Sequence, residues 1–113
     1  MNNTFITAGA APSGTSRTDI YECPNNFKGV VKFINVANVN ASNKTAKIEY
    51  YDSSATTYYA LSGSTSITGE GFINWIDITL VLEAGDKVTV TAGTANTIHA
   101  VVGVELIYNP LTT

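Results

Sequence analysis

Hydrophobic and polar positions alternate along much of the chain with the period of two that is typical of β-strands. Residues 87–92, KVTVTA, place two valines and an alanine on one side and a lysine and two threonines on the other. Residues 46–51, AKIEYY, repeat the pattern, so Ala46, Ile48 and Tyr50 are expected to face inward. Strands with one buried face and one solvated face produce this alternation.

Two longer stretches are apolar on both sides of the predicted strand. In residues 27–39, FKGVVKFINVANV, even-numbered positions are expected on one face and odd-numbered positions on the other, and both faces are mostly apolar. Residues 98–107, IHAVVGVELI, have the same property. A strand of this kind lies at the centre of a sheet, or it has an outer face that meets another chain.

The stretch from Ile78 to Ile107 contains three apolar runs separated by two turn signals. The turns are expected at residues 83–86, EAGD, and at residues 92–96, AGTAN. We interpret the three runs as a three-stranded antiparallel meander that closes a small all-β domain.

Further short strands are expected at residues 18–23, 57–61 and 64–68, and residues 46–51 and 57–61 are expected to form a hairpin. No stretch has the apolar spacing of an amphipathic helix over a dozen residues. The predicted fold class is therefore all-β, a single antiparallel two-sheet β-sandwich. The pattern leaves open whether its topology is immunoglobulin-like or jelly-roll-like.

The expected domain organisation has three parts. Residues 1–17 are small and polar apart from Phe5 and Ile6, and we expect a flexible N-terminal arm that becomes ordered by lying along a neighbour. Residues 18–110 are expected to form the β-sandwich domain, and residues 111–113 a short tail. The N-terminus has neither the charged region nor the apolar region of a secretory signal. No apolar stretch is long enough for a membrane-spanning helix.

Composition limits the possible partners. Hydrophobic residues make up 44% of the 113 residues and charged residues 13%, and the formal net charge is −3. An average chain has about 25% charged residues. The six lysines and arginines are scattered and form no basic stripe that could neutralise phosphates, so we expect no direct nucleic-acid binding and no membrane partner. Weak charge reduces repulsion between copies, which suits an assembly.

The residue types that carry most enzyme chemistry are scarce. The single cysteine, Cys23, excludes an intrachain disulfide and fits a chain folded in a reducing cytoplasm. The single histidine, His99, cannot build a transition-metal site with one distant cysteine, and no serine lies in a nucleophile elbow. Asp86, which follows Gly85, is interpreted as the cap of a tight turn. We therefore predict no catalytic residue, no metal site and no cofactor.

Four tyrosines form the main aromatic cluster. In the predicted hairpin, Tyr50 and Tyr51 lie nearly opposite Tyr58 and Tyr59, and cross-strand aromatic pairs stabilise a hairpin. Alternatively, these side chains form an exposed contact patch or stack on sugar rings. Trp75, together with Phe72, is interpreted as part of the core or of a seam, with a contact role as the alternative. The candidate interface residues are Phe5, Ile6, Tyr51, Tyr59, Trp75 and His99.

Several stretches resemble a group of small virion structural proteins of tailed bacteriophages. The matching stretches are residues 19–24, DIYECP, residues 30–38, VVKFINVAN, and residues 80–88, LVLEAGDKV, followed by the apolar run at 98–107. The resemblance spans roughly residues 18–107, and its motifs are structural landmarks without a catalytic signature. It implies a role in the virion, assembled in the host cytoplasm, as a capsid cement or decoration protein or as a neck, tail or fibre component.

These observations lead to one expected function and its alternatives. We expect a non-enzymatic capsid cement or decoration protein that contacts the major capsid protein or other virion proteins and forms a homo-oligomer, taken to be a trimer. A neck, tail or fibre-associated module is the alternative within the same class. From a different class, a carbohydrate-binding adhesion module would use the tyrosines and the asparagine-rich loops.

Overall fold

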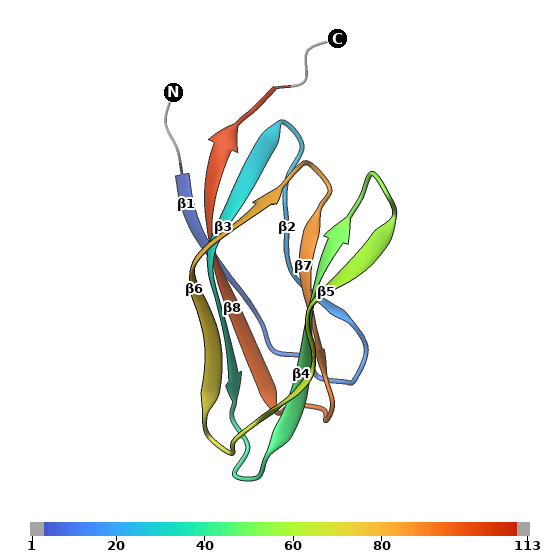
Figure 1. Ribbon diagram of the computed structural model, residues 1–113, viewed down its shortest axis with the longest axis vertical. Helices are drawn as coiled ribbons and strands as arrows, with labels where there is room; N and C mark the ends of the chain where they lie inside the picture. The colour runs from blue at the N-terminus through green and yellow to red at the C-terminus, as the bar shows by residue number, and fades with distance from the viewer. Residues whose placement is uncertain (1–3, 111–113) are drawn as a thin grey trace.

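The computed structural model describes residues 4–110, except for the side chains of residues 76–78, and every regular element in that part of the chain is a β-strand (Figure 1). The strands are β1 (Thr4–Ala10), β2 (Thr18–Glu22), β3 (Phe27–Asn38), β4 (Lys44–Asp52), β5 (Thr57–Ile67), β6 (Phe72–Leu82), β7 (Lys87–Ala92) and β8 (Ile98–Tyr108). None of the described residues forms a helix that could cross a membrane.

The strands form two four-stranded sheets, which we call sheet A, in the order β1-β8-β3-β6, and sheet B, in the order β2-β7-β4-β5. Every neighbouring pair in both sheets is antiparallel. The chain changes sheet at every connection except the hairpin from β4 to β5, so sequence neighbours mostly lie in opposite sheets. Eight strands connected in this way form a jelly roll. The all-β two-sheet sandwich predicted from the sequence is confirmed, and its topology is jelly-roll-like.

The core lies between the sheets and consists of the inward positions of alternating strands. Sheet A contributes Val31, Ile34 and Val36 from β3 together with the even-numbered residues of β8 from Ile98 to Leu106. Sheet B contributes Ile48, Val88 and Val90, each at most 1% exposed. The alternation predicted for residues 46–51, 87–92 and 98–107 is confirmed. β8 and β3 are each hydrogen-bonded on both sides, as their apolar faces predicted.

The predicted three-stranded meander is wrong. β6 and β8 both belong to sheet A but lie on opposite sides of β3, and β7 belongs to sheet B. Periodicity identifies strands but not their partners, and here each of the two turns carries the chain across the sandwich. Residues 57–61 and 64–68, expected as two strands, form the single strand β5, which continues through Gly63.

The N-terminal segment also differs from expectation. Residues 4–10 were expected in a flexible arm, but they form β1, which pairs with β8 from Thr4 opposite Leu106 to Ala10 opposite Ala100. Ile6, Ala8 and Ala10 pack against the core. The sandwich therefore begins at Thr4 and not at residue 18. The tail expected at residues 111–113 lies outside the described residues.

Candidate interaction surface

The outer face of sheet A is the side of that sheet turned away from sheet B. Its members follow from the strand register, because residues opposite one another in antiparallel strands point to the same side. They are Phe5, Thr7 and Gly9 of β1, His99, Val101, Gly103, Glu105 and Ile107 of β8, Lys28, Val30, Phe33, Asn35 and Ala37 of β3, and Phe72, Asn74 and Val81 of β6.

A β-bulge in β3 determines which side chains reach this face. The register shifts between Val31 and Phe33 against both neighbouring strands, so strict alternation breaks at Lys32. Val31 and Ile34 then both point into the core, and Phe33 points outward. The prediction that even-numbered residues of β3 share one face is therefore wrong before the bulge and right after it. An extra residue in one strand produces such a reversal.

Phe33 lies across the backbone of its neighbour in β8. A Cβ atom at Gly103 would collide with the ring of Phe33, so only glycine leaves room for the ring at this position. The ring covers the glycine, which is consequently buried, although it lies in an outward-facing row. At the centre of the face, the Phe33 ring therefore lies over the backbone of β8 and presents an apolar surface.

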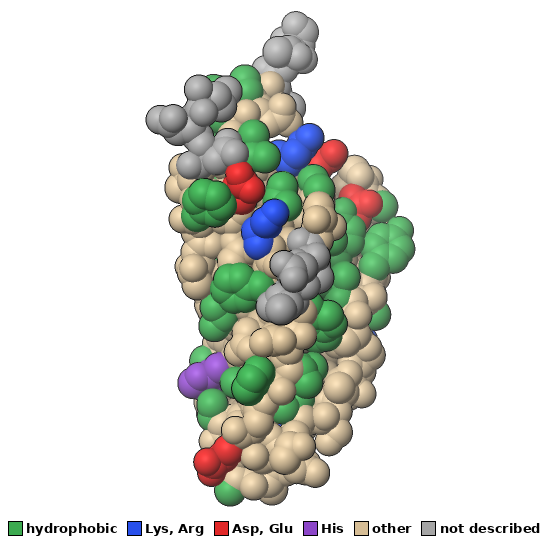
Figure 2. Space-filling view, turned by 60° about the vertical axis from the view of Figure 1, so that its left-hand side comes forward, with side chains coloured by type: hydrophobic (Ala, Val, Ile, Leu, Met, Phe, Trp, Pro, Cys, Tyr) green, Lys and Arg blue, Asp and Glu red, His purple; other side chains and the backbone are tan. Residues whose placement is uncertain are grey.

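Large apolar side chains are exposed around this centre. Phe5 is 74% exposed, Phe72 63% and Val81 41%, and they lie on the two edge strands β1 and β6. Seen from this side, hydrophobic and uncharged surface occupies most of the face, and most of the charged groups lie in its upper half (Figure 2). Phe5 and Val81 lie in one row across the sheet, with Glu105 and Val30 between them, and Phe72 lies at the other end of β6. Apolar side chains spread over one face in this way make that face a candidate interaction site.

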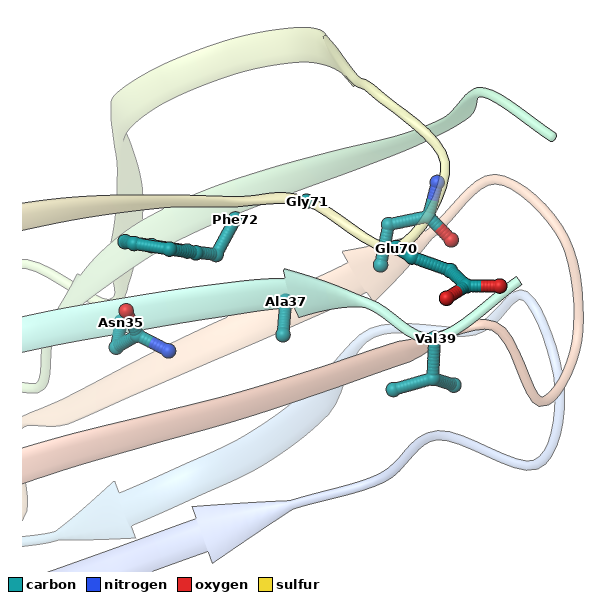
Figure 3. Close-up of a pocket in the computed structure, with 7 residues that line it drawn as sticks. Asn35, Ala37, Val39, Glu70, Gly71 and Phe72 are labelled. Atoms are coloured by element: carbon teal, nitrogen blue, oxygen red, sulfur yellow. The ribbon is translucent and has the colours of Figure 1, made fainter. Parts of the chain in front are cut away.

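A shallow hollow of about 610 Å³ lies at the end of the face where β3 ends and β6 begins. Asn35 and Ala37 of β3 and Phe72 of β6 line it, and Glu70 and Val39 lie at its far end (Figure 3). Two backbone hydrogen bonds connect the end of β3 to the neighbouring chain segments. Asn38 N–H donates to the Gly71 carbonyl, and Val39 N–H donates to the Thr97 carbonyl.

The buried side chain of Asn38 fixes the loop beside the hollow. Its Nδ2 donates to the carbonyl oxygens of Ser42 and Ile67, each at 2.9 Å, and its Oδ1 accepts from the Asn40 backbone N–H. The loop that carries Val39 is thus tied to the end of β5. The hollow combines one carboxylate, Glu70, and the amides of Asn35 and Asn38 with the apolar side chains of Ala37, Val39 and Phe72.

Sheet B carries the tyrosine cluster, and its geometry matches the predicted hairpin. Tyr50 lies opposite Tyr59, and Tyr51 opposite Tyr58. The ring centroids of Tyr51 and Tyr58 are 4.6 Å apart, and those of Tyr50 and Tyr59 are 6.3 Å apart. The cross-strand arrangement predicted from the sequence is confirmed.

Cations cover the rings of the outward pair. The guanidinium carbon of Arg17 lies 3.6 Å from the Tyr58 ring centroid, and Lys87 Nζ lies 5.4 Å from that of Tyr51. Arg17 Nε also donates to Glu49 Oε1 at 2.9 Å, and this hydrogen bond is the main reason that the pKa of Glu49 is lowered. These contacts stabilise the hairpin and leave the two rings poorly placed to stack on a sugar.

A second polar cluster is centred on Asp86, at the turn between β6 and β7. The carboxylate accepts hydrogen bonds from the backbone N–H groups of Ser53 and Glu83, both at 2.9 Å, from Ser53 Oγ at 2.9 Å and from the Tyr50 hydroxyl at 3.1 Å. Gly85 beside it has a φ of +89°, and a Cβ there would press on Ser53. The prediction that Asp86 caps a turn is confirmed.

The pKa values of this cluster follow from its geometry. Burial by itself would raise the pKa of Asp86, but the hydrogen bonds donated by Ser53, Glu83 and Tyr50 outweigh it and lower that pKa. Burial, together with the neighbouring Asp86 carboxylate, raises the pKa of Tyr50 to about 12. Both shifts favour the charge states that maintain the hydrogen bonds, so the cluster is structural.

The single cysteine and the single histidine occupy different environments. Cys23 is 1% exposed, donates to the Phe27 carbonyl at 3.3 Å, and has its pKa raised by burial, which makes it a poor nucleophile. His99 is exposed on the outer face of sheet A, as the strand alternation predicted. Among the described residues, no group of three or more histidine, cysteine, aspartate or glutamate side chains could hold a metal ion.

The six candidate interface residues do not form one surface. Phe5 and His99 lie on the outer face of sheet A, whereas Tyr51 and Tyr59 belong to the hairpin in sheet B, where Tyr59 is 51% exposed. Ile6 and Trp75 pack against the core instead. For Trp75 this agrees with the core interpretation.

Sequence reasoning missed most of the outer face. The sequence reading places Phe72 and Trp75 together in the core or in a seam, yet the two residues occupy opposite sides of β6, three positions apart. Val30, Phe33, Val81 and Val101 were not singled out either. The available signal was the apolar pattern on both faces of residues 27–39 and 98–107.

Comparison with known proteins supports the fold. No protein-family model and no curated protein matches the sequence. The structure is similar to a chain from Bacillus endospore appendages, described as a novel family of disulfide-linked pili, with a TM-score of 0.53 and 12% identity over 97% of this chain and 88% of that chain. It is also similar to the Drosophila NLP core, described for pentamer formation and histone binding, with a TM-score of 0.54 and 13% identity over 96% of this chain and 100% of that chain.

A more distant likeness is to the Cyanophage Pam1 capsid asymmetric unit, with a TM-score of 0.46 and 15% identity over 96% of this chain and 86% of that chain. This likeness supports no conclusion about the present chain. At identities this low, the first two similarities establish the fold alone.

Proposed function

We propose that this chain is a non-enzymatic structural subunit of a tailed-bacteriophage particle that binds neighbouring proteins through the outer face of sheet A. In the most specific form of the proposal, it is a capsid cement or decoration protein that stabilises the shell. The observation that carries the proposal is the exposure of Phe5, Phe72 and Val81 on one face of one sheet.

Physical arguments support an assembly role for that face. Covering apolar surface contributes about 25 cal/mol per Å², and the low charge of the face reduces the desolvation cost of covering it. The resemblance of residues 19–24, 30–38 and 80–88 to phage virion proteins favours a particle as the setting. Contacts repeated over a shell add through multivalency, so a modest interface per subunit is sufficient.

The test is co-sedimentation with phage particles assembled without this chain. We expect the purified protein to bind them at a fixed ratio, and Phe72→Lys to reduce binding because it places a charge in the covered area. Ser64→Lys, on the exposed β5 strand of sheet B, is the matched control and should bind normally. Unchanged binding of Phe72→Lys would contradict the proposed face.

Electron microscopy of labelled particles distinguishes the possible positions. Label distributed over the shell supports cement or decoration, whereas label at one vertex or along the tail supports a neck, tail or fibre component. Glycan-array binding by the isolated domain would instead favour adhesion, although the covered rings of Tyr51 and Tyr58 count against it. The trimer expected from the sequence stays a prediction, and the mass of the protein in solution tests it against the dimer proposed below.

A further inference from the structure

The four edge strands of the sandwich differ in how they discourage pairing with another chain. Proteins protect sheet edges with charges, prolines, bulges or short strands, because an unprotected edge is a template for a further strand. β2 has five residues, contains Asp19 and Glu22, and has a register shift. β6 contains Asp77 and lies opposite the bulge of β3, and β5 has two register shifts against β4. Each of these three edges carries at least one such feature.

β1 carries none of these features. Its seven residues, TFITAGA, include no charged residue and no proline. Its pairing with β8 is continuous over all seven residues without a register shift. The free side of β1 is therefore a regular ribbon of backbone hydrogen-bonding groups, at the border of the outer face of sheet A (Figure 1).

We propose that β1 pairs antiparallel with β1 of a second copy of this chain, about a twofold axis that is perpendicular to the sheet and passes midway between the two Thr7 residues. This pairing joins two four-stranded A sheets into one continuous sheet and places their outer faces side by side. A twofold contact is self-complementary, so a single patch serves both partners. The inference goes beyond the proposed function, because it concerns two copies of the chain and holds without any particle.

The side chains of β1 are complementary in this register. A twofold axis perpendicular to the sheet pairs outward residues with outward residues. Full overlap of the two seven-residue strands then places the two Thr7 residues opposite each other. Phe5 lies opposite Gly9 of the second copy on the outer face, and Ile6 opposite Ala8 on the inner side. Each pair matches a large side chain with a small one, as Phe33 and Gly103 do within the chain. No like charges meet.

Sedimentation velocity over a range of concentrations tests the pairing. We expect a reversible dimer with twice the 12.0 kDa mass of the chain. Thr7→Lys places two lysines beside the twofold axis and should weaken dimerisation by about fivefold. Thr7 is exposed, so circular dichroism should show an unchanged fold. Ser64→Lys, an equally exposed substitution on the edge strand β5, is the matched control and should dimerise normally.

Charge complementation tests the register directly. Thr7→Glu alone should also dimerise more weakly than the wild type, but a mixture of Thr7→Lys and Thr7→Glu chains should form a heterodimer that is tighter than either homodimer. A wild-type chain that is monomeric or trimeric at every concentration would overturn the inference, as would a Thr7→Lys chain that dimerises as tightly as the wild type. Phe72→Lys separates the two proposals: it should leave the dimer intact while lowering particle binding. Loss of the dimer in Phe72→Lys would place the contact on the face instead of the edge.

Discussion

At the scale of single residues, the best-defined feature is Asp86, which connects three separate turns through its buried carboxylate and its backbone carbonyl. Asp86 is 3% exposed, and it contacts the hairpin through Ser53 and its own turn through Glu83. Its backbone carbonyl also accepts from the Cys23 N–H, which lies between β2 and β3. One side chain and its backbone thus fix one end of the sandwich. The stabilisation is present above the ordinary pKa of Asp86 and is lost as the pH falls through the lowered pKa of the folded state.

Replacing this carboxylate should destabilise the fold. We expect Asp86→Ala to lower the free energy of unfolding by about 3 kcal/mol, because it leaves several donors without their acceptor in a buried place. Denaturant unfolding followed by circular dichroism measures the change. Asp52→Ala is the control: Asp52 accepts only from Ser54 among the hydrogen bonds described for its side chain, at an exposed site. Equal effects of the two substitutions would contradict the role assigned to Asp86.

The hydroxyl that donates to Asp86 predicts a response to alkali. The pKa of Tyr50 is raised from 10.0 in the unfolded chain to about 12 in the fold. A group with a raised folded pKa contributes stability below its unfolded pKa, and that contribution is lost as the pH rises through the folded value. The free energy of unfolding should therefore decline between these two pH values, and Tyr50→Phe should show a smaller decline. Parallel declines in the two proteins would show that other groups cause the loss.

At the scale of elements, the stability contribution of β1 tests whether the N-terminal segment is an integral part of the sandwich. Ile6 packs against the core, whereas its neighbour Phe5 is 74% exposed. Ile6→Ala should cost about 2 kcal/mol of stability, since it removes buried methyl groups. Phe5→Ala should change stability by less than about 0.5 kcal/mol, as surface substitutions do. Thermal or denaturant unfolding compares the two, and equal small effects would mean that β1 is not an integral strand.

The parts of the fold that depend on local sequence could be predicted. The Tyr50–Tyr51 and Tyr58–Tyr59 pairs face one another because a single short turn connects their strands, so register follows from the length of that turn. The inward row of β8 could be predicted as well, since alternation without a bulge assigns each residue to one side. His99 was accordingly placed on the outside.

The parts that depend on distant pairing could not be predicted. β3 pairs with β8, whose residues lie 60 (Asn38 to Ile98) to 81 (Phe27 to Tyr108) positions later in the chain, and no local pattern specifies that partner. The bulge at Lys32 exchanged the faces of β3 without a signal from glycine or proline, so Phe33 could not be assigned to the surface. The small residues of β1 have the composition of a linker. An edge strand can have this composition because its apolar neighbour β8 supplies most of the core contact.

At the scale of the whole molecule, the two sheets have different outer surfaces. On the outward side of sheet B, Arg17 and Lys87 lie over the rings of Tyr58 and Tyr51. The same two cations form ion pairs with Glu49 and Asp19. Sheet A leaves Phe5 and Phe72 exposed beside a shallow hollow. Sheet B exposes apolar surface on its edge strand β5, where Tyr59 is 51% and Leu61 39% exposed. The outer face of sheet A is the side that the proposed assembly role would cover.

This difference between the two sheets predicts an assembly that is insensitive to salt. Uncharged β1 and the weakly charged outer face of sheet A should associate with little electrostatic contribution. Raising the salt from about 0.05 M to about 0.5 M should therefore change the dimer dissociation constant by less than about threefold, although it shortens the range of charge interactions severalfold. Sedimentation velocity measures the constant. The heterodimer of Thr7→Lys and Thr7→Glu is the positive control, since its contact includes an introduced charge pair and should weaken clearly with salt. A wild-type dimer that weakens as steeply would show that charged groups such as Lys28 and Glu105 carry the contact, and the apolar explanation would then be wrong.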